Sequence, residues 1–189
     1  MKQARVLNEG ELKRVLAVID AGKHVRRNRL AILFSHYAGL RVGEIASLKW
    51  EDVLEANHSV KAVFYLDTEN TKSNEARAVH LNQLLQKEIG RHWLALDDYK
   101  CLSQPVILSQ RNKAFSANTL CQLFTRLYQA AGLDGASSHS GRRWFITKLA
   151  HSGVSPKVIM ELAGHKHLGT TQRYIDVNEE MKSNAVALL

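Results

Sequence analysis

Residues 155–175 read SPKVIMELAGHKHLGTTQRYI, and this stretch says most about how the chain folds. Its serine–proline start is typical of a helix N-terminus, because a serine side chain caps free N–H groups and proline fits the first turn. Apolar residues recur as far as Ala163, and Gly164 is suited to ending the helix. A further helical turn is predicted from Thr170 to Tyr174. The C-terminal third is therefore predicted to consist of short helices joined by tight turns.

The same signals predict further elements upstream and downstream. Asn8 and Glu11 form a capping box before a stretch of helical periodicity. Gly39 is placed to end a second helix, which is expected to begin near Arg29. Further helices are predicted over residues 42–48, 83–94, 116–130, 141–151 and 179–189. Two segments, 60–66 and 76–81, have strand-like composition or alternation and predict a hairpin.

These elements give an α+β fold that is mainly α-helical, with one small antiparallel β-sheet. No low-complexity tract or linker divides the 189 residues, so a single domain over residues 1–189 is expected. Its last segment, residues 178–189, is predicted to be a tail helix with an apolar end.

Bulk composition restricts the classes of partner. Lysine and arginine number 26 against 18 aspartates and glutamates, which gives a net charge of +8. This favours an anionic partner, with nucleic acid first and a membrane surface second, although a basic protein without such a ligand fits equally well. No apolar run approaches the length of a spanning helix. Cys101 and Cys121 are isolated, as expected of reduced thiols in a cytoplasmic protein.

Six polar side chains occur in motifs that suit one chemistry. They are Arg41 in AGLRVGE, Lys72 in TKSNEAR, His139 and Arg142 in HSGR, His165 in GH, and Tyr174 nine residues after His165. Two guanidinium groups can hold the non-bridging oxygens of a phosphodiester. A tyrosine can attack the phosphorus, and a lysine can protonate the departing oxygen. The set is thus suited to cleaving a phosphodiester without a metal.

In the order and spacing of these motifs, from about Leu7 to the C-terminus, the chain resembles the catalytic domain of tyrosine recombinases of the phage integrase family. The resemblance implies that Tyr174 is the nucleophile and forms a 3′-phosphotyrosyl intermediate. It implies that Arg41 and Arg142 bind the scissile phosphate and that Lys72 is the general acid for the 5′ oxygen. His139 and His165 would donate hydrogen bonds near the reacting atoms, and Glu44 would support Arg41.

Other basic residues are expected to contact DNA phosphates around the site. They are Arg77, Arg143, Arg26, Arg27 and Lys113. Of these, Arg143 is expected to point away from the face that His139 and Arg142 share. His167 raises the alternative of a zinc site, but no cysteine or carboxylate has a suitable local spacing, so neither a metal nor another cofactor is predicted.

The resemblance also implies partners. These are double-stranded DNA, three further copies in a homotetramer on paired sites, and accessory DNA-bending proteins; the isolated chain is expected to be a monomer and to avoid membranes. The tail helix would pack on its own domain or on a neighbouring protomer. Family members usually carry an N-terminal helical domain, so the chain is either a piece of a longer protein or a short member. A bacterial cell, phage or plasmid is the expected source.

Two other functions fit parts of the sequence. Residues 155–175 are similar to a helix–turn–helix, which would suit a catalytically inactive DNA-binding regulator. A type IB topoisomerase would use the same chemistry without site preference. A pure binder has no need of a nucleophile, an acid and a phosphate clamp together, so the recombinase is favoured. The sequence leaves open integration, excision, inversion and resolution, as well as the DNA target.

Overall fold

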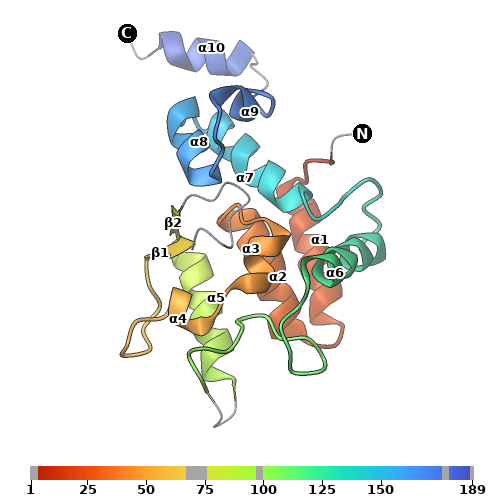
Figure 1. Cartoon of the computed structure of the whole chain (residues 1–189). Helices are drawn as coiled ribbons and strands as arrows, with labels where there is room; N and C mark the ends of the chain where they lie inside the picture. Colours follow the sequence, from red (N-terminus) through yellow and green to blue (C-terminus); the bar gives the residue numbers. More distant parts are fainter. Residues whose placement is uncertain (1–3, 67–75, 97–99, 176–178, 188–189) are drawn as a thin grey trace.

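The computed structural model describes residues 4–66, 76–96, 100–175 and 179–187 (Figure 1). The helices within these residues are α1 (Glu9–Asp20), α2 (Val25–Tyr37), α3 (Val42–Ser47), α4 (Trp50–Val53), α5 (Gln83–Leu94), α6 (Ala117–Ala130), α7 (Ser140–His151), α8 (Pro156–Ala163), α9 (Leu168–Gln172) and α10 (Glu179–Val186). The strands are β1 (Val63–Leu66) and β2 (Arg77–His80). The mainly helical α+β class predicted from the sequence is confirmed.

The predicted capping signals act as expected. The Asn8 side chain accepts from the backbone N–H of Glu11, whose carboxylate accepts in return from the N–H of Asn8. Ser116 and Ser155 cap α6 and α8 through their hydroxyl groups. Because these bonds satisfy N–H groups that have no partner within the helix, each helix begins at a defined residue.

Helix α2 is the centre of the packing. It contacts α1, α3, α5 and α7, and residues 30–34 are all buried. The main hydrophobic core extends from α1 to α6, whereas α7 and α8 form a second small core around Ile146, Ala150, Ile159 and Ala163. Tyr174 packs at the edge of this second core. The contact between α2 and α7 therefore sets how the C-terminal third lies on the rest of the chain.

The two strands pair in antiparallel register, with Val63 opposite His80 and Leu66 opposite Arg77. Because successive side chains of a strand point to opposite faces, Phe64, Leu66 and Val79 lie in the core. Arg77 also points inward, and β2 packs against α8. The predicted turn of this hairpin, with Lys72, lies outside the described residues.

Several elements differ from the predictions, including β1, which begins at Val63 and not at residue 60. Helix α2 begins at Val25 and not near Arg29. Its N-cap residue, His24, has a left-handed backbone (φ 58°) and makes no side-chain cap, so the sequence carries no signal for this helix start. Helix α4 has only four residues and was not predicted. Helix α9 begins two residues before the predicted turn. Within the described part of the chain, no helix is long and apolar enough to span a bilayer.

Candidate active site

Arg41 lies at a rigid junction between two helices. Gly39 ends α2 with φ 62°, and a Cβ atom there would lie 2.5 Å from the Phe145 ring. A side chain at this position would therefore strain the backbone and push α7 away. Arg41 then caps α3, with its own N–H donating to Glu44 Oε2 at 2.7 Å. The backbone on both sides of Arg41 is thus fixed.

Glu44 is a buried carboxylate that joins two arginines. It accepts from Arg41 Nη1 at 2.7 Å and from Arg77 Nη2 at 2.8 Å, and only 2% of its side chain is exposed. Burial alone would raise the pKa of Glu44. The charge of Arg77, the hydrogen bond from the Arg41 N–H and the charges of Arg41 and Arg142 lower it by more, so the pKa of Glu44 lies below its ordinary value. Glu44 is therefore ionised at neutral pH and holds both guanidinium groups in place.

Arg142 reaches the same place from the first turn of α7. Its Nη1 donates to the carbonyl of Gly39 at 2.6 Å, and its Nη2 donates to the carbonyl of Ala163. Gly141 allows this approach, since a Cβ atom there would lie 2.5 Å from Ser35 Oγ on α2. Burial, followed by the charges of Arg41 and Arg77, lowers the pKa of Arg142 to about 9. Arg142 is still protonated at neutral pH.

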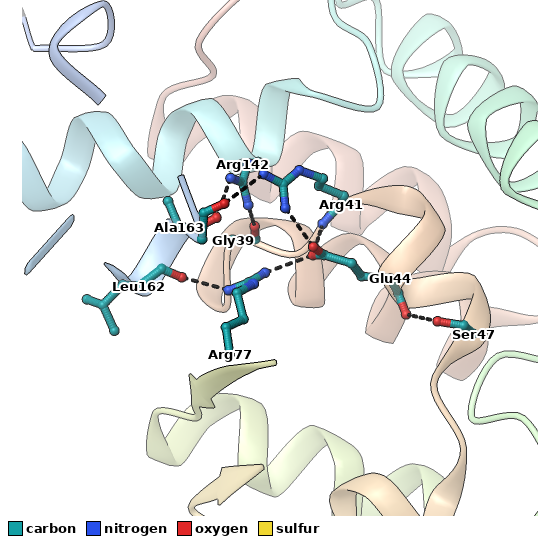
Figure 2. A network of polar contacts seen from close by, with 9 residues as sticks. Gly39, Arg41, Glu44, Ser47, Arg77, Arg142, Leu162 and Ala163 are labelled. Carbon is teal, nitrogen blue, oxygen red and sulfur yellow. Dashed lines mark hydrogen bonds and ion pairs between the residues drawn. The ribbon is translucent and has the colours of Figure 1, made fainter. Parts of the chain in front are cut away.

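The three arginines converge on the C-terminal end of α8. Arg77 Nη1 donates to the carbonyl of Leu162 at 2.7 Å, Arg142 Nη2 to that of Ala163, and Arg41 Nη2 to that of Gly164 at 3.1 Å (Figure 2). Three successive carbonyls, which lack partners within the helix, each receive one guanidinium N–H. The negative end of the helix dipole also favours cations here. The cluster of like charges is thus stabilised by one carboxylate and one helix terminus.

His165 and Tyr174 lie beside this cluster. The rings are stacked, with centroids 5.8 Å apart and an angle of 23°. His165 Nδ1 is 2.9 Å from the hydroxyl oxygen of Thr171, which is fully buried. Burial and the charges of Arg142, Arg41 and Arg77 lower the pKa of His165 to about 4. The imidazole is therefore neutral at pH 7, and if Thr171 donates to Nδ1, Nε2 carries the proton and can donate to an oxygen.

A hollow of about 330 Å³ lies next to the tyrosine. It is lined by Ala4, His139, Arg143, Thr170, Arg173 and Tyr174. His139 is the N-cap residue of α7. The guanidinium carbon of Arg143 lies 5.2 Å from the centroid of the Tyr174 ring. Arg143 therefore faces the tyrosine, whereas the neighbouring Arg142 points to the carbonyls of Gly39 and Ala163.

A second hollow of about 530 Å³ lies between β2 and α8. Its lining includes Arg77, Gly164, His165 and Lys166. Among the described residues, no group of three histidines, cysteines or carboxylates is arranged to hold a metal ion. The donors around this site are instead those that recognise a phosphate, since guanidinium and imidazole N–H groups match its oxygens.

The structure places most of the predicted catalytic residues together. The structure brings together Arg41, Glu44, Arg142, His165 and Tyr174, with His139 bordering the tyrosine's hollow. The predicted general acid, Lys72, lies outside the described residues. Sequence analysis assigned no role to Thr171 or to the carbonyls of α8. Main-chain groups leave no signal in a sequence, whereas Thr171 has only the weak signal of its place three residues before Tyr174.

The predicted phosphate-binding residues have varied surroundings. Arg26 and Lys113 are exposed. Arg27 is largely buried: it donates to the Leu108 carbonyl at 3.0 Å and to Asn28 Oδ1, and its guanidinium lies over Phe115. Arg77 is buried too, with Glu44 and Leu162 as partners. Internal contacts thus hold the guanidinium groups of Arg27 and Arg77 in place.

Comparisons with known proteins bear on the family of the chain. Residues 5–181 match the phage integrase family. The chain is 31% identical over 179 residues to tyrosine recombinase XerA of Thermococcus kodakarensis, covering 93% of this chain and 59% of that protein. It is 26% identical over 176 residues to tyrosine recombinase XerC of Lactobacillus delbrueckii subsp. bulgaricus, covering 90% and 57%. The chain thus spans less than two thirds of the length of these relatives.

Solved structures share the fold. A crystal structure of XerA recombinase superposes with a TM-score of 0.77 at 22% identity, over 100% of this chain and 66% of that one. The Tn1549 transposon integrase in complex with transposon right end DNA gives 0.79 at 17% identity, over 99% and 66%. Together with the sequence match over residues 5–181, the likeness leads to one assignment: the chain belongs to the phage integrase family.

Proposed function

We propose that this chain cleaves and rejoins DNA strands as a site-specific recombinase, through a covalent 3′-phosphotyrosyl intermediate. The observation that carries the proposal is the convergence of Arg41, Arg142 and the neutral His165 beside Tyr174. Each guanidinium has five N–H donors, so contacts to Glu44 and main-chain carbonyls leave donors for a phosphate. Cations aimed at developing negative charge are the usual means of stabilising such a transition state.

The reaction is a transfer between two oxygens on one phosphorus. The phenolic oxygen of Tyr174 bonds to phosphorus, the bond to the 5′ oxygen breaks, and the phenolic proton passes to solvent. The 5′ oxygen takes up a proton, for which Lys72 is the proposed donor. A phosphotyrosyl ester resembles the original diester in energy, so attack by a 5′ hydroxyl reverses the step and rejoins a strand without a nucleotide cofactor.

Double-stranded DNA is the proposed partner. Similar structures include the Tn1549 integrase with DNA and the XerH site-specific recombinase bound to its difH substrate. The net charge of +8 and the exposed Arg26 and Lys113 fit such a partner. Assembly of four copies on paired sites, accessory DNA-bending proteins, exchange of the tail helix and a cytoplasmic location belong to the same proposal.

Trapping of the covalent intermediate tests the proposal. Duplexes that tile the DNA flanking the gene are 5′-labelled and carry a nick just 3′ of each candidate cleavage position. Cleavage then releases a short fragment with a 5′ hydroxyl, which diffuses away and prevents rejoining. Wild-type protein should acquire label that resists SDS, while Tyr174→Phe should bind DNA without acquiring it. A labelled adduct of undiminished yield in Tyr174→Phe would refute the nucleophile, and binding without any wild-type adduct would favour a regulator.

A further inference from the structure

Arg77 is held on two sides by internal acceptors. Its two terminal nitrogens donate to the Leu162 carbonyl and to Glu44, and only 8% of the side chain is exposed. Arg41, in comparison, keeps 25% of its side chain exposed. Arg142 is equally buried, with 5% exposed, but its partners are the carbonyls of Gly39 and Ala163, whereas Arg77 shares the Glu44 carboxylate with Arg41.

Both acceptors that orient the Arg41 guanidinium are in turn held by Arg77. Arg41 Nη1 donates to Glu44 Oε1, and the other oxygen of that carboxylate accepts from Arg77. Arg41 Nη2 donates to the carbonyl of Gly164. Gly164 itself packs on the Arg77 stem, since a Cβ atom there would lie 2.4 Å from Arg77 Cδ. Arg77 also binds the carbonyl of Leu162 in the same turn.

We propose that Arg77 is a positioning residue for Arg41, and that it does not itself contact the DNA. It fixes the Glu44 carboxylate from one side and the last turn of α8 from the other, so the Arg41 guanidinium has one orientation before DNA arrives. Such preorganisation matters because a donor that has to reorient during the reaction loses part of its stabilising effect. The inference deepens the proposed function and rests on it for the reaction being measured.

The test compares Arg77→Met with the wild type on the nicked duplex. If Arg77 positions Arg41, the maximal rate of adduct formation should fall by about 10–100-fold, as for other residues that orient a catalytic group. The protein concentration that gives the half-maximal rate should change by less than about threefold. Arg77→Lys should recover part of the rate, because an ammonium can pair with Glu44 but cannot make both contacts. Arg29→Met is the matched control, since Arg29 pairs with Glu88 at a distance from the site.

Two measurements separate positioning from DNA contact and from a general loss of structure. An arginine that binds a phosphate contributes about one unit to the slope of log affinity against log salt, so Arg77→Met should leave that slope unchanged. In an Arg41→Ala background, Arg77→Met should cost less than about threefold, because the residue it positions is gone. A slope reduced by about one unit, or an equally large cost in the Arg41→Ala background, would overturn the proposal.

A second variant and a second ligand keep the result decisive. In Arg77→Met the Glu44 carboxylate keeps Arg41 as its partner but loses Arg77. Combining Arg77→Met with Glu44→Gln removes this buried charge, so the double variant is the alternative if the single variant does not fold, and its rate should be no higher than that of Arg77→Met. Inorganic phosphate at matched ionic strength should raise the Tm of the wild type, with an apparent Kd about tenfold weaker in Arg77→Met. If no DNA gives an adduct, the proposed function fails. The phosphate titration then decides alone, and an unchanged Kd refutes the role of Arg77.

Discussion

Glu44→Gln tests the electrostatic organisation of the arginine cluster. The substitution preserves the shape of the side chain but removes its charge and turns one acceptor into a donor. The new amide N–H group would face an N–H group of Arg41 or Arg77. The ion pairs of Glu44 with Arg41 at 2.7 Å and with Arg77 at 2.8 Å would both be lost. Since only 2% of the Glu44 side chain is exposed, solvent cannot take over the role of the carboxylate.

The expected cost follows from these contacts. Removing one member of a buried ion pair destabilises a protein by about 3–5 kcal/mol, and the retained amide oxygen places Glu44→Gln near the lower limit of about 3 kcal/mol. For a domain of this size, each kcal/mol lowers Tm by about 2–4 °C, so Tm should fall by about 6–12 °C. Thermal and urea unfolding followed by circular dichroism would measure both quantities.

The control and the pH dependence sharpen this test. Glu9 pairs with Lys148 at 3.0 Å, but both side chains are more than half exposed, so Glu9→Gln should cost less than about 1 kcal/mol. The lowered pKa of Glu44 stabilises the fold above the ordinary carboxyl pKa, and this contribution disappears as the pH falls through the lower folded value. The cost of Glu44→Gln should therefore shrink in acid. A cost equal to that of Glu9→Gln at neutral pH would refute the reasoning.

Three further predictions concern groups around the site. Burial lowers the pKa of His36 from 6.5 to about 4, so on acidification the unfolded chain binds this proton before the folded chain does. Lowering the pH from 6.5 to 4 should therefore reduce the free energy of unfolding by about 3 kcal/mol (2.5 pH units at 1.36 kcal/mol each). Denaturant titrations at several pH values should show this loss in the wild type and not in His36→Gln. Gly141→Ala should destabilise the fold by about 1–3 kcal/mol in urea unfolding, because its Cβ atom would meet Ser35 and His36. Gly43→Ala is the control and should have no such effect, since the nearest neighbour of its Cβ atom lies at 3.9 Å. Equal effects of the two substitutions would contradict the close approach of α7 to α2. Thr171→Val keeps the buried volume but removes the hydroxyl that orients His165, and should slow adduct formation about tenfold without lowering Tm by more than a few degrees; an unchanged rate would mean that the hydroxyl is dispensable.

Local signals account for what was predictable from the sequence. The capping box at Asn8 and the serine caps of α6 and α8 act within four residues, so their helices begin where predicted. Arg41, Arg142, His165 and Tyr174 were predicted as site residues from their chemistry and from the order and spacing of their motifs, which resemble those of the family. Their convergence in the structure then follows from how α2, α7 and α8 pack.

Interactions between distant segments account for what the sequence did not predict. An arginine at the start of a strand normally faces solvent, and nothing in the motif around Arg77 shows that β2 packs on α8. Likewise, the spacing along α7 separates Arg143 from Arg142, but the return of the chain through α9 brings Tyr174 to Arg143. The three carbonyls that receive the arginines are main-chain groups, which only a tertiary structure can identify.

Mass spectrometry of the trapped adduct identifies the residue that attacks the phosphodiester. The SDS-resistant product is digested with a protease and a nuclease, and the peptide that carries residual nucleotide is sequenced by fragmentation. The account predicts a nucleotide joined through its 3′ phosphate to the oxygen of Tyr174, together with a free 5′ hydroxyl on the released strand. A nucleotide on any other side chain, or a 5′-phosphate linkage, would contradict it.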